Sequence, residues 1–169
     1  MSRVLIISDS HGLTAEIEGI KNRHQADVMI HCGDSELDLD ATELNGFLKV
    51  AGNCDIDSRY PNEQTPVIGG LTFYVTHGHL DNVKSNLSTL SYRAAEKDAQ
   101  IICYGHTHIA GAEQIDGQLF INPGSIRLPR NRVEKTYAIM EWESSDNIIV
   151  AFHTVSGKKV EELTYRASL

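Results

Sequence analysis

Short runs of apolar, β-branched residues recur along the chain, each followed by a polar or glycine-containing stretch. The five clearest runs lie at residues 4–8, 28–31, 47–50, 71–76 and 101–104. Runs of this kind, apolar almost throughout, are typical of strands that are buried on both faces, because a half-exposed strand would alternate with polar residues. We therefore predict five buried strands at these positions.

Two stretches between these runs have helical spacing instead. The first apolar stripe comprises Leu13, Ile17 and Ile20. The second comprises Val83, Leu87, Leu90 and Ala94. Apolar residues three and four positions apart lie on one face of a helix, so each stripe predicts a helix that is buried on one side. The chain thus opens as strand, helix, strand, and a second helix over residues 83–97 precedes the strand at 101–104.

The second half of the chain has the pattern of antiparallel strands. Gly69-Gly70 and Asp116-Gly117 are two-residue hairpin signals, and residues 119–121, 137–142 and 148–154 have the composition of strands. No linker rich in proline, serine or glycine divides the two halves. We predict a single α/β domain over residues 1–169, built as a sandwich of two sheets with helices outside.

Composition narrows the class of protein. The 169 residues suit one domain, and 41% apolar residues suffice for its core. With 15 basic against 23 acidic residues the net charge is -8, which disfavours nucleic acid as a partner. The longest apolar stretches are strand-sized, so no membrane span is expected. The start of the chain has no signal-peptide pattern and the cysteines number three, so we expect reduced thiols and a cytoplasmic location.

Polar residues with metal-binding side chains gather directly after the five predicted strands. They are Asp9 and His11, Asp34, Asn53 and Asp55, His77 and His79, and His106 and His108. A single such group after a strand is more often a helix cap or a turn, but five together favour one shared site. Imidazole, carboxylate and amide oxygen are a ligand set for Mn, Fe, Zn or Ni, whereas a thiolate zinc site would need paired cysteines. So many ligands suggest two ions that share one carboxylate, and Asp34 is our candidate for the bridge.

Other polar residues have simpler interpretations. His24 and His153 stand apart from every group, and we expect them to be packing or surface residues. Cys32 and Cys103 are expected to be small buried side chains. The segment 122–125, Asn-Pro-Gly-Ser, is either a tight turn alone or a turn that approaches the same crevice.

The ordered motifs strongly resemble those of the calcineurin-like metallophosphoesterase superfamily, in its short bacterial and archaeal phosphodiesterase branch. They are Asp9-x-His11, Gly33-Asp34, Gly52-Asn53-x-Asp55, His77-Gly78-His79 and Gly105-His106-Thr107-His108. The resemblance implies a four-layer α/β/β/α sandwich of two mixed sheets flanked by helices. It also implies a dinuclear site, with Mn²⁺ as the usual metal and Ni²⁺, Fe²⁺ or Zn²⁺ as alternatives.

Carried over by position, the resemblance gives two ligand sets that share Asp34. The first set is Asp9, His11, Asp34 and His108, and the second is Asp34, Asn53, His77 and His106. The implied reaction is hydrolysis of small phosphate esters by in-line attack of a metal-bridging hydroxide. Asn53 and His106 would also act in catalysis, by donating hydrogen bonds to the phosphoryl oxygens.

One position departs from the family pattern, and it leaves the leaving-group acid open. Many relatives have histidine where this chain has Cys54, and that histidine is thought to protonate the leaving oxygen. Asp55 or His79 are the candidates to replace it. Alternative functions are a non-catalytic scaffold of the same fold, as in a retromer subunit, or hydrolysis of dinucleoside polyphosphates. The sequence leaves a homo-oligomer open.

Overall fold

The computed structural model describes residues 1–169 as two six-stranded sheets packed against each other, with one α-helix packed on the outer side of each. The first sheet has the strand order β12-β11-β10-β1-β2-β3. Its members are β1 (Ser2–Ile7), β2 (Val28–His31), β3 (Phe47–Lys49), β10 (Thr136–Ser144), β11 (Asn147–Thr154) and β12 (Tyr165–Ala167). Strands β1, β2 and β3 are parallel, and the pairs β1–β10, β10–β11 and β11–β12 are antiparallel. This sheet is therefore mixed.

The second sheet is mixed in the same way and has the order β4-β6-β7-β9-β8, with β5 paired to β6. Its members are β4 (Glu63–Gln64), β5 (Val67–Ile68), β6 (Leu71–Thr76), β7 (Ile101–Cys103), β8 (Gly111–Ile115) and β9 (Gln118–Asn122). Strands β6, β7 and β9 are parallel, while β4, β5 and β8 pair antiparallel. Both hairpins predicted at Gly69-Gly70 and Asp116-Gly117 are confirmed, as β5–β6 and β8–β9.

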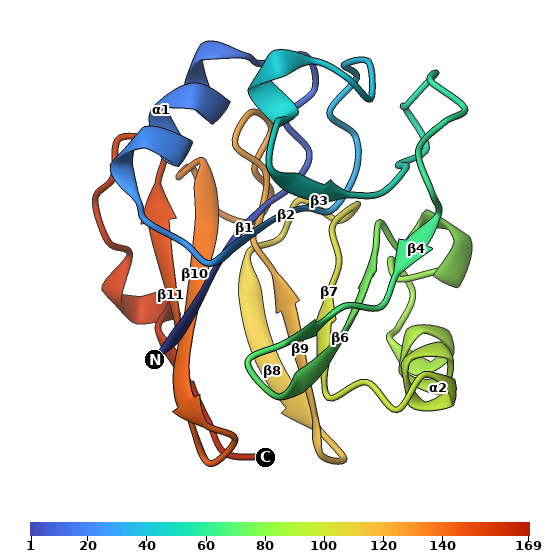
Figure 1. The fold of residues 1–169 in the computed structure, drawn as a ribbon, viewed down its shortest axis with the longest axis vertical. Helices are drawn as coiled ribbons and strands as arrows, with labels where there is room; N and C mark the ends of the chain where they lie inside the picture. Colours follow the sequence, from blue (N-terminus) through green and yellow to red (C-terminus); the bar gives the residue numbers. More distant parts are fainter.

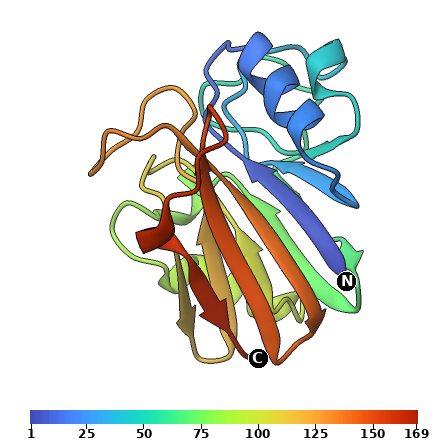
Figure 2. The same cartoon turned by 90° about the vertical axis from the view of Figure 1, so that its left-hand side faces the viewer.

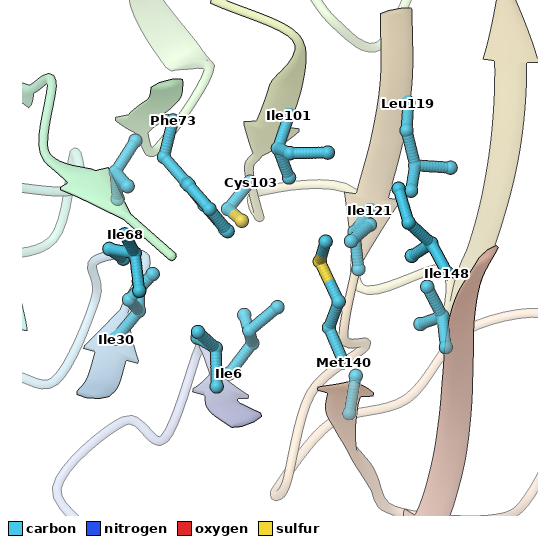
Figure 3. Packing of buried hydrophobic residues seen from close by; sticks show 14 of the residues in the cluster. Ile6, Ile30, Ile68, Phe73, Ile101, Cys103, Leu119, Ile121, Met140 and Ile148 are labelled. Atoms are coloured by element: carbon cyan, nitrogen blue, oxygen red, sulfur yellow. The ribbon is translucent and has the colours of Figure 1, made fainter. Parts of the chain in front are cut away.

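Alternate residues of the central strands face opposite sides, and this explains why their sequences are apolar throughout. In β1, Val4 and Ile6 belong to a cluster of 21 buried residues between the sheets, whereas Leu5 and Ile7 belong to a cluster on the outer face. Figure 3 shows side chains from both sheets meeting in the inner cluster, among them Phe73, Ile101, Ile121 and Met140. The inner cluster is thus the interface between the two sheets.

Each outer face is covered by a helix that supplies part of the predicted apolar stripe. Leu13, the first residue of the first stripe, lies before its helix but packs against the same cluster. Helix α1 (Ala15–Arg23) buries Ile17 and Ile20 against the first sheet, and α2 (Ser88–Glu96) buries Leu90 and Ala94 against the second. Three short 3₁₀ turns complete the structure, namely η1 (Thr42–Leu44), η2 (His79–Asp81) and η3 (Glu161–Leu163). Figures 1 and 2 show the resulting layers from two directions. The predicted four-layer α/β/β/α arrangement of two mixed sheets is confirmed.

The start of the second helix is the clearest error of the sequence prediction. The helix begins at Ser88, not at residue 83, because Asn82 has a left-handed backbone (φ 52°) and the Asn86 side chain accepts the Ser88 N–H at 3.0 Å. Val83 and Leu87 still pack with the cluster under α2, but from the preceding turns. The apolar stripe therefore identified the packing correctly and the helix boundary wrongly.

The arrangement of the parallel strands decides where a site can form. In Figure 1, β1 runs upward from the N-terminus, and the segments after β1, β2 and β3 leave the sheet away from both termini. Strands β6 and β7 are parallel neighbours in the facing sheet, so their carboxyl ends lie side by side. Neither α-helix has the length and hydrophobicity that crossing a membrane requires.

Candidate metal centre

The loops after β1, β2, β6 and β7 are joined by backbone hydrogen bonds at one end of the sandwich. The N–H of Asp9 donates to Gly33 O at 3.0 Å, and the N–H of Gly105 donates to His77 O at 3.0 Å. The two sheets are linked where the N–H of His106 donates to Asp9 Oδ2 at 3.1 Å. Polar segments that are distant in sequence therefore meet at a single place.

A first group of metal-binding atoms comes from Asp9, His11 and His108, whose ligand atoms all lie within 4.8 Å of one another. His11 Nε2 is 3.3 Å from His108 Nε2. Asp9 Oδ1 is 3.1 Å from His108 Nε2 and 3.8 Å from His11 Nε2. The side chains of all three are at most 12% exposed.

A second group, formed by Asp9, Asp34 and His77, adjoins the first and shares Asp9 with it. His77 Nε2 is 3.2 Å from Asp34 Oδ2 and 3.7 Å from Asp9 Oδ1. The exposed side chain of Asn53 joins this group, with Oδ1 at 3.1 Å from His77 Nε2. Asp34 Oδ2 also lies 4.0 Å from His11 Nε2, so both carboxylates reach toward both groups.

The outer nitrogen of each of these histidines is held by a hydrogen-bond acceptor. Nδ1 of His77 lies 2.7 Å from Cys32 O, and Nδ1 of His108 lies 2.6 Å from Leu128 O. Nδ1 of His11 lies 2.7 Å from the Glu36 carboxylate. Because an acceptor requires a proton on Nδ1, each neutral imidazole directs the lone pair of Nε2 into the centre.

Lone pairs that face one another at these distances match a cation site. In the first group, two imidazole lone pairs and Asp9 Oδ1 converge, and Asp9 Oδ1 is buried without any hydrogen-bond donor. In the second group, His77 Nε2 faces two oxygens, Asp34 Oδ2 and Asn53 Oδ1, that are both acceptors. A buried acceptor without a donor is unfavourable unless a cation or a proton takes its place. The residues present therefore fit two divalent ions.

Backbone strain is concentrated in the same residues. Asp9, His11, Asp34, His106 and His108 all have positive φ, between 42° and 70°. Non-glycine residues rarely adopt this conformation, and residues held in it cluster at functional sites. The loops are also packed closely against one another. At Gly105, for example, a Cβ atom would lie 2.5 Å from Asp9 Oδ2.

The charged groups of the centre are coupled. Burial would raise the pKa of Asp34, but the hydrogen bond and charge of His77 hold it well below its ordinary value. Contact with the Asp9 carboxylate raises the pKa of His108. The pKa of His77 is also raised, because the nearby carboxylates outweigh its burial. Burial would raise the pKa of Asp9 too, but His108 and His77 lower it, so both carboxylates are anionic. They attract positive charge to the histidines, which a divalent ion could supply instead.

The structure brings six of the seven predicted ligands into these groups and leaves His106 beside them. The His106 ring lies 5.1 Å from the His77 ring, centroid to centroid, and belongs to neither group. Burial, together with His77 and Lys84, lowers the pKa of His106 to about 4, so its ring is neutral near neutral pH. A neutral imidazole carries one N–H that can be donated to a ligand.

Asp55 and the segment 122–125 hold the loops of the centre in place. The Asp55 carboxylate accepts the backbone N–H groups of Asp34, Glu36 and Gly52 at 2.7–2.8 Å. With these donors Asp55 holds three backbone segments together, and the ring of His79, the other candidate for a leaving-group acid, lies 6.2 Å from the His106 ring, centroid to centroid. Ser125 Oγ donates to Asp9 O at 2.7 Å, so the segment 122–125 does approach the crevice.

Sequence reasoning missed several residues that orient the ligands. Glu36 holds His11, and its position two residues after Asp34 was the only available signal. The carbonyls of Cys32 and Leu128 have no sequence signal, because every residue has a carbonyl. His31 is fully buried behind the centre, where its Nδ1 accepts the Gly33 N–H at 3.1 Å and its Nε2 lies 2.8 Å from Ser10 Oγ.

The cysteines and the isolated histidines lie as expected. Cys32 and Cys103 are buried, and Cys54 is exposed. His24 and His153 lie away from the two groups and pack around Tyr137, with His24 Nε2 at 2.6 Å from the Tyr137 hydroxyl. Neither histidine belongs to a group of metal-binding atoms.

Comparison with known proteins finds a family model and a relative that each match most of the chain. A family model described as the calcineurin-like phosphoesterase superfamily domain matches residues 2–145. A probable metallophosphoesterase of Bacillus subtilis, YsnB, is 48% identical over 168 residues, which are 98% of this chain and 99% of that protein.

Two further matches are with a solved structure and with a yeast sequence. The crystal structure of a predicted phosphoesterase from Streptococcus pneumoniae superposes with a TM-score of 0.95 at 34% identity, covering 99% of this chain and 98% of the other. The vacuolar protein sorting-associated protein 29 of Schizosaccharomyces pombe is 29% identical over 145 residues, which are 76% of this chain and 78% of that protein.

Proposed function

The chain belongs to the calcineurin-like phosphoesterase superfamily, and we propose that it is a dinuclear, metal-dependent phosphodiesterase that hydrolyses small phosphate esters. The observation that carries this proposal is the pair of adjoining groups in which lone pairs face one another without donors between them. We propose Mn²⁺ as the metal, with Ni²⁺, Fe²⁺ or Zn²⁺ as alternatives, because imidazole, carboxylate and amide oxygen suit all four.

The proposed ligand sets follow the two groups. Asp9, His11 and His108 would hold one ion, and Asn53 and His77 the other, with His106 completing the second set. Asp34 would bridge, since its Oδ2 faces His77 at 3.2 Å and His11 at 4.0 Å while its Oδ1 is fixed by the Cys54 N–H at 2.8 Å. Asp9 Oδ1 lies at similar distances from the same two nitrogens, 3.8 Å from His11 Nε2 and 3.7 Å from His77 Nε2. Asparagine variants of the two carboxylates distinguish which one bridges.

Two divalent ions, when bound, would lower the pKa of a water molecule, orient it for in-line attack and polarise the phosphoryl oxygens. The chain supplies the orientation of the ligands, and the centre would be locally positive once both ions are bound. Two carboxylates against two divalent ions leave an excess of positive charge in a protein whose net charge is -8. With both ions bound, phosphate would therefore be attracted to the centre although the protein as a whole is acidic.

Asn53 and His106 are proposed to act on the substrate as well. The Asn53 amide places Oδ1 toward His77 and donates one Nδ2 hydrogen to Cys54 Sγ at 3.6 Å, which leaves its second N–H for a phosphoryl oxygen. The neutral ring of His106 offers one N–H beside the second group. Donors fixed in advance stabilise the charge that develops on the phosphoryl oxygens during the reaction.

Metal dependence is the direct test. After dialysis against EDTA, hydrolysis of bis(p-nitrophenyl) phosphate should be lost, and added Mn²⁺ should restore it. Elemental analysis of the restored protein should show two ions per chain. Full activity in protein shown to be free of metal would overturn the proposal.

A scaffold without activity is the second candidate, because vacuolar protein sorting-associated protein 29 is among the relatives. Protein that binds two ions tightly and hydrolyses no phosphate ester in a broad panel would favour the scaffold. The panel should contain diesters, monoesters and dinucleoside polyphosphates, since hydrolysis of the last class alone would favour the polyphosphate alternative. The shared inner core also leads us to propose that residues 1–169 act as one domain.

A further inference from the structure

A cavity of about 480 Å³ opens beside the candidate metal centre. Its lining consists of Glu36, Leu37, Asp38, Cys54, Ile56, Asp57 and Arg59. Two of these residues are in contact with the centre itself. Glu36 binds His11 at 2.7 Å, and the N–H of Cys54 donates to Asp34 Oδ1 at 2.8 Å. The cavity wall and the ligand loops are therefore continuous.

The apolar part of the lining contains one residue that is almost fully exposed to solvent, where a polar residue would be usual. The side chain of Ile56 is 96% exposed, three residues after the proposed ligand Asn53. Leu37 and Cys54 complete the apolar part. An organic group that reached into the cavity would remove Ile56 from water, which is favourable.

The charged part of the lining has a net charge of -2, from three acidic residues and one basic residue. The single positive charge is already neutralised, because Arg59 is paired with Asp57 at 2.8 Å and with Asp40 at 3.1 Å. Asp38 is exposed and its carboxylate has no hydrogen bond or ion pair. No free cation in the cavity could receive an anionic group.

We propose that this cavity receives the second organic group of a phosphodiester and selects groups that are cationic or uncharged over groups that are anionic. The inference rests on the proposed phosphodiesterase function and adds the substrate class to it. The phosphoryl group would lie at the metal centre, and the group that stays on phosphorus would contact Leu37 and Ile56. Substrates with further phosphates on that side, such as dinucleoside polyphosphates, would be disfavoured by Glu36 and Asp38.

Three substrates with one leaving group test this selection without changing the chemistry at phosphorus. They are p-nitrophenyl phosphodiesters whose second group is choline, neohexyl or carboxypropyl. Neohexyl is the uncharged isostere of choline, so the first two differ only in charge. We expect kcat/KM to fall in the order choline, neohexyl, carboxypropyl, by about threefold to tenfold for each unit of charge, as for partly screened charges near a protein surface.

Variants of Asp38 assign the selection to the cavity. Asp38→Asn should reduce the preference for choline over neohexyl by about threefold, and Asp38→Lys should remove or reverse it. Asp116→Asn is the matched control, because Asp116 is an exposed acid in the β8–β9 turn and outside the cavity lining. Ile56→Ser should raise KM for the neohexyl substrate and leave kcat nearly unchanged.

Binding gives a readout that does not depend on turnover. Phosphocholine added to the zinc-loaded, isotope-labelled protein should move the amide signals of Leu37 and Ile56, and Asp38→Lys should weaken this binding. Equal kcat/KM for all three substrates, unaffected by Asp38→Lys, would overturn the cavity inference and leave the phosphodiesterase proposal intact. Absence of metal-dependent hydrolysis for all three would instead reject the phosphodiesterase proposal.

Discussion

Replacing Asp34 by asparagine tests the proposed bridge with little change in shape. The amide keeps an oxygen that can accept the Cys54 N–H, which donates to Oδ1 at 2.8 Å, and removes one negative charge from the centre. Asp34 Oδ2 lies 3.2 Å from His77 Nε2 and 4.0 Å from His11 Nε2. If both ions are held at these nitrogens, each loses the same charged ligand.

The size of the effect follows from the geometry. The ligand atoms of each group lie within 4.8 Å of one another, so an ion among them is close to every one. One unit of negative charge at about 4 Å from a divalent ion is worth about 8 kcal/mol at an effective dielectric constant of about 20, twice the value for two unit charges. Because the asparagine oxygen can still bind the ion as a neutral ligand, we take about half of this energy as the expected loss for each ion, which corresponds to about a thousandfold weaker binding.

Equilibrium dialysis followed by elemental analysis, with titration calorimetry for the dissociation constants, measures this loss. Asp34→Asn should bind both ions about a thousandfold more weakly. Asp9→Asn should weaken only one, and His24→Ala, which lies outside both groups, should weaken neither. Two ions bound to Asp34→Asn with wild-type affinity would refute the bridge. Loss of both ions in Asp9→Asn alone would assign the bridge to Asp9.

Three further predictions concern residues around the centre. Burial lowers the pKa of His31 from 6.5 to about 4. Between these pH values the unfolded chain binds more protons than the folded chain. The contribution of neutral His31 to stability is therefore lost as pH falls through this window. In urea titrations of metal-free protein, the difference in unfolding free energy between wild type and His31→Gln should shrink from neutral to acidic pH, whereas a constant difference would contradict the assignment. Asp55→Ala removes a carboxylate that accepts three backbone N–H groups and should lower the unfolding free energy by about 2–3 kcal/mol in the same titrations. An unchanged midpoint would show that Asp55 does not hold these segments together. Cys54→His should speed hydrolysis of alkyl phosphates by up to about 10²- to 10⁴-fold and that of nitrophenyl phosphates much less, since only an alkoxide needs a proton as it leaves. Equal dependence on leaving-group pKa in both proteins would exclude residue 54 from this step.

Much of the fold could be predicted because the sandwich has three separate apolar layers. A strand between two such layers is apolar at every position, and β1 follows this rule with Val4 and Ile6 inward and Leu5 outward. The helices needed only one apolar face each, which their spacing of three and four revealed. The start of α2 could not be read in this way, because Val83 packs in the same cluster without being helical. Apolar periodicity reports burial, and local hydrogen bonds such as that of Asn86 decide the boundary.

The candidate site could be located from the sequence, but its geometry could not. Strand ends followed by aspartate, asparagine and histidine indicated where ligands meet, since parallel strands end at one edge. The sequence did not show that Asp9 reaches both groups, or that His106 stands beside them. These features depend on left-handed backbone at Asp9 and His106, a conformation that is uncommon for non-glycine residues and that the sequence pattern does not predict.

The same surroundings connect the candidate site to the stability of the fold. Cys32 O and Leu128 O fix the rings of His77 and His108 so that their lone pairs face carboxylate oxygens instead of water. Without a cation, two states are open to the histidines. Either Nε2 takes up a proton, or its lone pair faces a carboxylate oxygen with no hydrogen between them, and both states cost free energy. The left-handed residues add a further cost. The inner cluster of 21 buried residues lies between the two sheets that carry these loops, and its burial is what offsets such costs. A bound ion would remove the repulsion between these lone pairs and the carboxylate oxygens. Ligand orientation, backbone strain and metal affinity therefore contribute to the same free-energy difference.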